Sequence, residues 1–200
     1  MSMLKSQVLM KLKAVFLDKD GSVIPDIDYN VSSNKVTLTD GVVEGLQILQ
    51  SNGYLLVMVS NPTDRENGYF SVEKHHADDE KISRMCSKIG IYLDGFYYCE
   101  NEKPLPGLIQ KAASDMHIEL SDSWMIGDVL RDVEAGNRAG CKSILINNGS
   151  EKEWKAGEDR MPEFFAKDLS EAAKYIIASA NVRDSEKKII YETKYTTHQA

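Results

Sequence analysis

The chain has 200 residues, of which 42% are hydrophobic and 28% are charged, and its formal net charge is −7. This length allows one α/β domain with a substantial core and excludes two large domains, while the acidic balance excludes the basic surface that nucleic acids or anionic membranes require. The 3 cysteines are widely spaced and imply no disulfide framework. No apolar run approaches the roughly 20 residues that span a bilayer, and the first residues lack a signal-peptide pattern. A cytoplasmic protein is therefore expected.

The first predicted strand, residues 13–18, ends in a pair of carboxylates. Its apolar run is typical of a buried strand, and Asp18-Lys19-Asp20-Gly21 is typical of a turn. Ligands of open α/β sheets bind at the carboxyl ends of strands, so both acids would lie at a ligand-binding edge. Their oxygens suit Mg²⁺, and a rigidly held carboxylate can attack phosphorus. Taken alone, the motif is also the pattern of an ordinary strand followed by a polar turn.

A second polar motif follows the apolar run of residues 54–59, which predicts another strand. A loop over residues 20–38 and a helix near residues 41–52 separate it from the first motif. Ser60-Asn61 supplies a hydroxyl at a strand end and then a turn with backbone N–H groups. Such a turn can hold phosphate oxygens.

The third motif is a lysine placed just before a predicted helix. A helix near residues 73–89 and a short strand at residues 95–98 precede it. Lys103 then stands ahead of Pro106, which is typical of a first helical position. A solvated loop lysine is the alternative interpretation.

The fourth motif ends a strand around Trp124 with a Gly-Asp turn. Asp128 and Asp132 are four residues apart, so both can face one way as the helix predicted at residues 130–139 begins. A strand at residues 143–146 and an amphipathic helix near residues 169–177 complete the pattern.

Alternating strands and helices of this kind predict a Rossmann-like parallel sheet with helices on both faces. Residues 1–180 would form this single domain. Residues 181–200 are polar apart from one short apolar cluster. They are interpreted either as a disordered tail or as an edge strand or a subunit-swapped arm.

In this order, the four motifs resemble those of the haloacid dehalogenase (HAD) superfamily of phosphatases, and within it the heptose bisphosphate and histidinol phosphate phosphatase group. The likeness runs over residues 13–180, nearly the whole chain. It implies a Mg²⁺-dependent phosphomonoesterase that hydrolyses a small phosphorylated metabolite, such as a sugar phosphate, through an aspartyl-phosphate. Asp26 and Tyr29 match the relatives' loop after the first motif, which implies a substrate loop.

The resemblance also implies a role for each motif residue. Asp18 would be the nucleophile, and Asp20 would protonate the leaving alkoxide and later deprotonate the hydrolytic water. Asp132 would either reach the metal through water or cap its helix. Mg²⁺ would be held by Asp18, the backbone carbonyl of Asp20 and Asp128, and the phosphoryl oxygens by Ser60, Asn61 and Lys103.

Several departures from the family pattern bear on substrate and metal. The relatives carry a zinc loop of Cys and His before the lysine, but Cys99 stands alone there and cannot make a four-ligand site, so zinc is predicted to be absent. Glu102 and Val129 replace the relatives' arginine and lysine, so heptose 1,7-bisphosphate is not expected to be turned over far better than monophosphates. The motif intervals leave no room for a large cap domain.

Two other functional classes fit parts of the pattern. A non-catalytic HAD-like interaction or regulatory protein would explain Glu102, Val129 and the missing zinc loop. A receiver-type phosphoacceptor also uses Mg²⁺, a strand-end Asp, a hydroxyl and a lysine. Its acceptor lies on a later strand, whereas Asp18 follows the first strand and is paired with Asp20, which favours hydrolysis.

Overall fold

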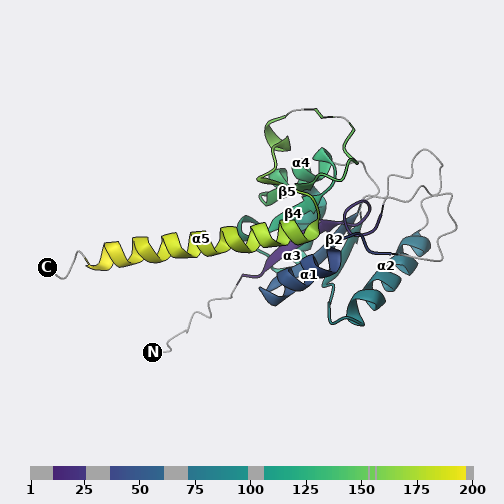
Figure 1. The fold of residues 1–200 in the computed structure, drawn as a ribbon, viewed down its shortest axis with the longest axis horizontal. Coiled ribbons are helices and arrows are strands. Elements are labelled where there is room, and N and C mark those ends of the chain that lie inside the picture. The colour runs from purple at the N-terminus through teal and green to yellow at the C-terminus, as the bar shows by residue number, and fades with distance from the viewer. Residues whose placement is uncertain are drawn as a thin grey trace, which may run out of the picture.

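The computed structural model describes residues 11–25, 37–60, 72–98, 106–152, 154–155 and 157–196, with the backbone alone for residues 72–75 and 183–196. A six-stranded, all-parallel sheet in the order β3-β2-β1-β4-β5-β6 forms its centre (Figure 1). The strands are β1 (Lys13–Asp18), β2 (Tyr54–Ser60), β3 (Gly95–Tyr98), β4 (Trp124–Gly127), β5 (Lys142–Ile146) and β6 (Phe164–Ala166). The helices are α1 (Val42–Ser51), α2 (Val72–Ser87), α3 (Pro106–Met116), α4 (Leu130–Ala139) and α5 (Leu169–Thr196), with 3-10 turns η1 (Leu120–Asp122) and η2 (Glu158–Arg160).

The central strands are buried on both faces, because their side chains alternate between two hydrophobic clusters. Val15 and Leu17 of β1 belong to the cluster that contains the buried residues of α1, α2 and α5. Ala14 and Phe16 belong to a second cluster, which includes buried residues from both α3 and α4. Helices therefore cover both faces of the sheet, and the predicted Rossmann-like α/β fold is confirmed.

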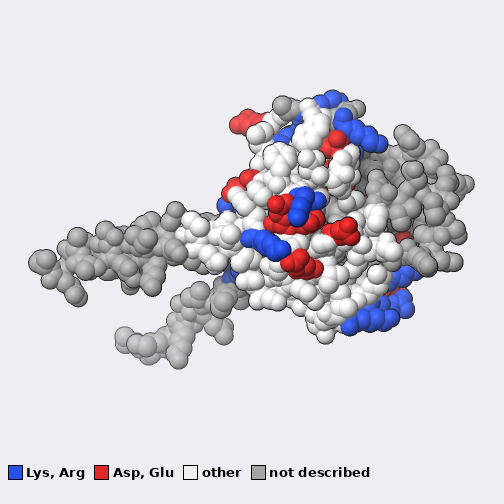
Figure 2. Space-filling model, in the orientation of Figure 1, with Lys and Arg blue, Asp and Glu red and all other residues white. Residues whose placement is uncertain are grey.

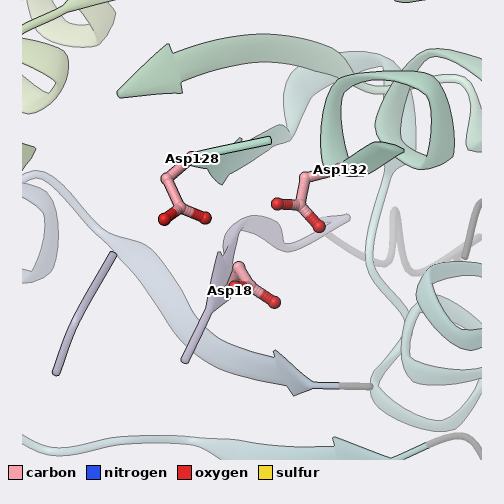
Figure 3. Close-up of side chains that lie close together, drawn as sticks. All are labelled: Asp18, Asp128 and Asp132. Atoms are coloured by element: carbon pink, nitrogen blue, oxygen red, sulfur yellow. The ribbon is translucent and has the colours of Figure 1, made fainter. Parts of the chain in front are cut away.

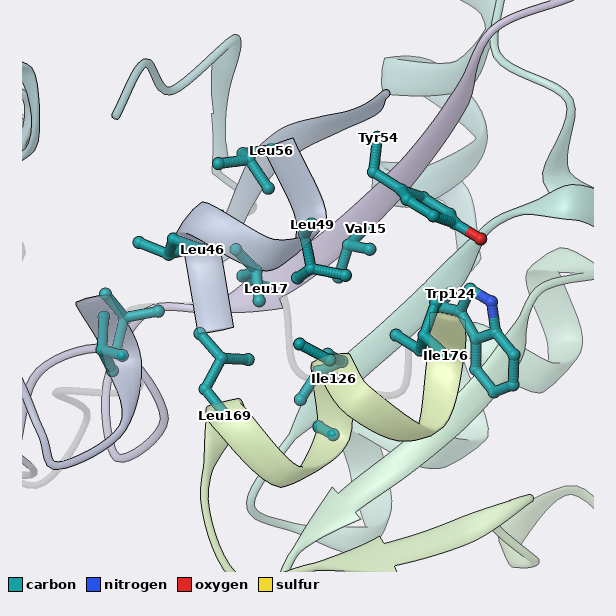
Figure 4. Packing of buried hydrophobic residues seen from close by; sticks show 14 of the residues in the cluster. Val15, Leu17, Leu46, Leu49, Tyr54, Leu56, Trp124, Ile126, Leu169 and Ile176 are labelled. Carbon is teal, nitrogen blue, oxygen red and sulfur yellow. The ribbon is translucent and has the colours of Figure 1, made fainter. Parts of the chain in front are cut away.

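Helices α1 and α5 pack together over one face of the sheet. Leu46 and Leu49 of α1 and Leu169 and Ile176 of α5 meet side chains of β1 and β4 in one apolar cluster (Figure 4). At the rim of this contact, Lys174 Nζ lies 2.8 Å from Glu44 Oε1. Basic and acidic side chains are interspersed over the face of the molecule in Figure 2 and form no large region of one sign there.

The strand order places the central strand β1 where the direction of winding changes. The chain moves from β1 through β2 to β3 on one side and then returns to β4, which pairs with β1 on the other side. At such a switch point the loops after the strands diverge and leave a crevice for ligands. The residues that follow β1 and β4 are therefore brought together at one edge of the sheet.

The C-terminal segment differs from the prediction. The backbone of α5 is helical as far as Thr196, so residues 181–196 form neither a disordered tail nor a strand. No glycine or proline occurs in residues 181–200, so nothing in the sequence stops a helix that packing has already started. Strand β6 has only three residues and was not predicted from the sequence. Within the described residues, no helix is both long and apolar enough to cross a membrane.

Candidate active site

The turn after β1 fixes the position of Asp18. The Lys19 carbonyl accepts hydrogen bonds from the backbone N–H groups of Val23 (3.1 Å) and Ile24 (3.0 Å), and Gly21 N–H donates to the Ile24 carbonyl (2.8 Å). Gly21 adopts a φ of 84°, which is accessible to glycine at little cost. Asp18 is 6% exposed. The acid at the strand end is therefore held on a rigid, closed turn.

Asp18 forms a compact cluster with two further carboxylates. One ligand atom from each of Asp18, Asp128 and Asp132 can be chosen so that all lie within 4.8 Å of one another, and all three residues are buried. Figure 3 shows the three side chains converging from β1, from the loop after β4 and from the first turn of α4. Residues more than 100 positions apart in the sequence thus meet at the switch point of the sheet.

Glycine at position 127 is what allows Asp132 to approach. A Cβ atom at Gly127 would lie 2.3 Å from the Cβ atom of Asp132, far inside van der Waals contact. Asp132 Oδ2 also accepts a hydrogen bond from the Val129 backbone N–H at 3.4 Å. Asp132 therefore caps α4, which is one of the two roles that the sequence left open, and it also lies in the carboxylate cluster.

The donor set suits a hard divalent cation. Buried carboxylates so close together repel one another unless they are protonated or neutralised by a positive charge. Oxygen ligands of this type bind Mg²⁺ or Ca²⁺ in preference to softer metals, which favour thiolate or imidazole. The residues present therefore fit Mg²⁺, the ion predicted from the sequence.

Asp20 lies outside this cluster and contacts Ser60 instead. The Ser60 hydroxyl at the end of β2 donates a hydrogen bond to Asp20 Oδ2 at 3.2 Å. Ser60 is buried and Asp20 is partly exposed. The structure thus brings together the predicted acid–base residue and the predicted phosphate ligand, and leaves the Asp20 carboxylate apart from the candidate metal ligands.

A buried ion pair beside the site was not predicted. Lys19 is 2% exposed, and its Nζ atom lies 3.8 Å from Asp79 Oδ1 of α2 and 5.7 Å from the centre of the Tyr98 ring. Burial raises the pKa of Asp79 to about 6, against the opposing attraction of Lys19 and His76. The pattern of α2 gave no signal for this pair, because Asp79 sits in a run of charged residues that resembles a solvated helix face.

Four of the predicted site residues lie outside the described residues. They are Asp26, Tyr29, Asn61 and Lys103. Cys99, on which the zinc argument depends, lies outside them as well. The roles assigned to these residues remain predictions.

Comparisons with known proteins identify the family of the chain. A family model for HAD-hydrolase-like proteins matches residues 101–172, which include Asp128 and Asp132. D-glycero-β-D-manno-heptose-1,7-bisphosphate 7-phosphatase of Pasteurella multocida (strain Pm70) is 34% identical, over 68% of this chain and 83% of that protein. The enzyme of the same name from Haemophilus ducreyi (strain 35000HP / ATCC 700724) is 35% identical, over 70% of this chain and 86% of that protein.

Solved structures show the same likeness. The D,D-heptose 1,7-bisphosphate phosphatase of B. bronchiseptica, crystallised with magnesium and phosphate, superimposes with a TM-score of 0.72 at 26% identity and covers 84% of this chain and 99% of that chain. The corresponding enzyme of Burkholderia thailandensis gives a TM-score of 0.62 at 27% identity, over 82% and 98% of the two chains. The sequence and structure comparisons therefore agree, and the chain belongs to the HAD superfamily of phosphatases.

Proposed function

We propose that this phosphatase hydrolyses a small phosphorylated sugar in a Mg²⁺-dependent reaction that passes through an aspartyl-phosphate on Asp18. The observation that carries the proposal is the convergence of the buried carboxylates of Asp18, Asp128 and Asp132 within 4.8 Å at the carboxyl edge of the sheet. The names of the relatives support a sugar phosphate as the substrate class. The magnesium and phosphate in the B. bronchiseptica structure support the choice of ion.

Asp18 and Asp128, with the backbone carbonyl of Asp20, would hold the Mg²⁺ ion, and Asp132 lies beside them. When bound, the ion neutralises negative charge on the carboxylates and on the phosphoryl group during transfer. Asp132 either shares in this coordination or supports it through water. The negative charge of these clustered carboxylates supports the proposed metal requirement.

In the first half-reaction, a carboxylate oxygen of Asp18 attacks phosphorus and forms a new P–O bond. The bond between phosphorus and the leaving oxygen breaks, and Asp20 donates its proton to that oxygen. In the second half-reaction, Asp20 removes a proton from water, whose oxygen attacks phosphorus, and the bond to Asp18 breaks. Inorganic phosphate and both carboxyl groups are regenerated, with no net change in protons on the protein.

Ser60 is proposed to bind the phosphoryl oxygens together with the Asn61 backbone N–H and Lys103. The contact between Ser60 and Asp20 supports the first of these assignments, because it places the hydroxyl next to the proton donor. Asp26 and Tyr29 would contact the sugar from the loop after the first motif. Zinc is still predicted to be absent, which metal analysis of the purified protein would test.

Heptose 1,7-bisphosphate is the first compound to test, since the relatives are named for it. Because Glu102 and Val129 replace two cationic residues, we predict less positive charge at the entrance of the active site than in those enzymes. No large preference for the bisphosphate over sugar monophosphates is therefore expected. A strong preference would show that cations elsewhere in the chain recognise the second phosphate.

The decisive experiment compares the wild type with Asp18→Asn, which preserves the shape of the side chain and removes the nucleophilic carboxylate. Phosphate release from p-nitrophenyl phosphate and from a panel of sugar phosphates is measured with Mg²⁺ and with EDTA. We expect Mg²⁺-dependent turnover in the wild type and a loss of roughly 10³-fold or more in the variant. Acid-quenched wild type should also carry hydroxylamine-labile phosphate. Absence of turnover on every compound would favour the non-catalytic alternative.

A further inference from the structure

The loop that follows β5 reaches back to the candidate metal site through one side chain. Asn148 Nδ2 donates a hydrogen bond to the Gly21 carbonyl at 2.9 Å and another to Asp128 Oδ2 at 3.3 Å. Gly21 belongs to the turn after β1, and Asp128 belongs to the loop after β4. A single amide group therefore bridges the two loops that carry the candidate ligands Asp18 and Asp128.

The orientation of this amide is fixed by a third hydrogen bond. The backbone N–H of Ser150 donates to Asn148 Oδ1 at 3.0 Å, so the oxygen end of the amide faces its own loop. Since a backbone N–H can only donate, the NH₂ end must face Gly21 and Asp128. Gly149, with a φ of 90°, provides the turn between the two residues.

The loop is also anchored at a second point beside the site. Glu151 Oε2 accepts a hydrogen bond from the backbone N–H of Leu130 at 2.6 Å. Leu130 is the first residue of α4, two positions after Asp128. The segment from Asn148 to Glu151 therefore contacts the Asp128 loop at the Asp128 carboxylate and again at the backbone of Leu130.

Asp128 Oδ2 is tightly confined between these groups. A Cβ atom at Gly21 would lie 1.9 Å from this oxygen, so the carboxylate rests directly against the backbone of the first-motif turn. The Asn148 amide contacts the same oxygen. One oxygen of Asp128 therefore lies against the Gly21 backbone and accepts from the Asn148 amide, and both contacts restrict the rotation of the carboxylate.

We propose that Asn148 is a positioning residue of the metal site, whose amide holds the Asp128 carboxylate in the orientation that binds Mg²⁺. The inference rests on the proposed function in taking Asp128 as a ligand. Hydrogen-bond partners of metal ligands typically contribute about 10- to 100-fold to metal affinity, because they fix the ligand before the ion arrives. Loss of the Asn148 amide would allow Asp128 to rotate among positions that do not coordinate.

The test measures metal binding without substrate. The EDTA-treated full-length protein is titrated with Mg²⁺ while its melting temperature is recorded, for the wild type, Asn148→Ala and the control Asn147→Ala. Asn147 is the exposed neighbour whose backbone N–H, retained in alanine, donates to the Ala166 carbonyl. We expect Asn148→Ala to need about 10 to 100 times more Mg²⁺ for half of the shift, and the control to match the wild type.

A second variant distinguishes the hydrogen bonds that the Asn148 amide donates to Gly21 and Asp128 from the hydrogen bond that it accepts from Ser150 in the turn. Asn148→Asp keeps the oxygen that accepts from Ser150 N–H but turns a carboxylate oxygen toward two acceptors, so we expect it to bind Mg²⁺ more weakly than the wild type. Weaker binding in Asn148→Ala together with unchanged binding in Asn148→Asp would show that only the turn matters and would overturn the proposal. A lower melting temperature without Mg²⁺ combined with an unchanged Mg²⁺ midpoint in Asn148→Ala would also overturn it.

The same titration distinguishes this inference from the function on which it rests. If the wild type shows no Mg²⁺-dependent shift, both the metal site and the role of Asn148 are refuted. If the wild type shifts and Asn148→Ala has the same midpoint, only the role of Asn148 is refuted. Steady-state kinetics give a second readout: the Mg²⁺ concentration at half-maximal rate should rise in Asn148→Ala, with a smaller change in KM for the sugar phosphate.

Discussion

At the scale of single residues, Asp20 lies apart from the other acids, as its proposed role in acid–base catalysis requires. Its carboxylate accepts a hydrogen bond from Ser60 and lies outside the cluster of Asp18, Asp128 and Asp132. A group that must gain and lose a proton in each cycle benefits from this separation, because direct coordination would hold it ionised.

Asp20→Asn should therefore affect substrates according to their leaving groups. We expect turnover of an alkyl sugar phosphate to fall by about 10²–10⁴-fold, since the alkoxide then leaves without a proton. The loss on p-nitrophenyl phosphate should be smaller, because its phenolate needs no protonation to leave. Rates on both substrates at saturating Mg²⁺ test this expectation. Equal losses on the two would contradict the assignment of Asp20 as the general acid.

The raised pKa of the Asp79 carboxyl group makes the stability of the folded protein depend on pH. Burial raises its pKa in the folded protein to about 6, whereas an unfolded aspartate titrates near pH ~3.9. Between these values the folded state holds a proton that the unfolded state has lost, so this group's contribution to stability falls as the pH rises from about 4 to about 6 and is constant above that range.

We accordingly expect Asp79→Asn, which cannot ionise, to gain stability relative to the wild type as the pH rises across that window. Urea unfolding of both proteins between about pH 4 and pH 7 measures the difference. Asp115→Asn is the control, because the hydrogen bond with Lys111 lowers the pKa of the exposed Asp115. It should show no such gain. A difference between Asp79→Asn and the wild type that does not vary with pH would contradict the expectation.

At the scale of elements, α5 is held by the apolar face that it places on α1 and the sheet. Ile176 is fully buried in that cluster, while Lys174 is exposed and paired with Glu44. An exposed ion pair stabilises a fold by at most about 1 kcal/mol, whereas truncating a buried isoleucine costs about 2–5 kcal/mol.

Ile176→Ala should therefore lower the free energy of unfolding by about 2–5 kcal/mol, and Lys174→Ala on the same helix should lower it by much less. Chemical denaturation of the two variants checks the contrast. Comparable losses would mean that α5 is attached mainly through its charged rim.

At the scale of the whole molecule, the parallel sheet gathers the acids and the Ser60 hydroxyl from separate strand ends at one edge. Three carboxylates at this edge repel a phosphate dianion unless a cation lies between them. Binding of Mg²⁺ and of inorganic phosphate should therefore be cooperative.

We expect phosphate alone to shift the melting temperature little, and phosphate with Mg²⁺ to raise it by more than the sum of the separate shifts. Asp128→Asn, which removes one charge from the cluster, should lose this cooperativity. Thermal melts over a matrix of the two ligands provide the measurement. Additive shifts in the wild type would indicate separate sites.

The sequence by itself determined the alternation of strands and helices and the acids at the ends of the first and fourth strands, because apolar periodicity and turn residues are local properties. Asp18, Asp20, Ser60 and Asp128 were identified as candidates in this way. Local patterns did not reveal β6, whose three residues are too few for a periodic signal, or the helical continuation of α5.

Only the tertiary structure decided which distant residues meet. Asn148 and Gly21 are 127 positions apart and share a hydrogen bond because β1, β4 and β5 lie side by side in the sheet. The approach of Asp132 to Asp18 and the pairing of Lys19 with Asp79 arise in the same way. Such contacts depend on strand order and helix packing, which bring distant segments together. The local sequence of one segment does not indicate which distant segment it will contact.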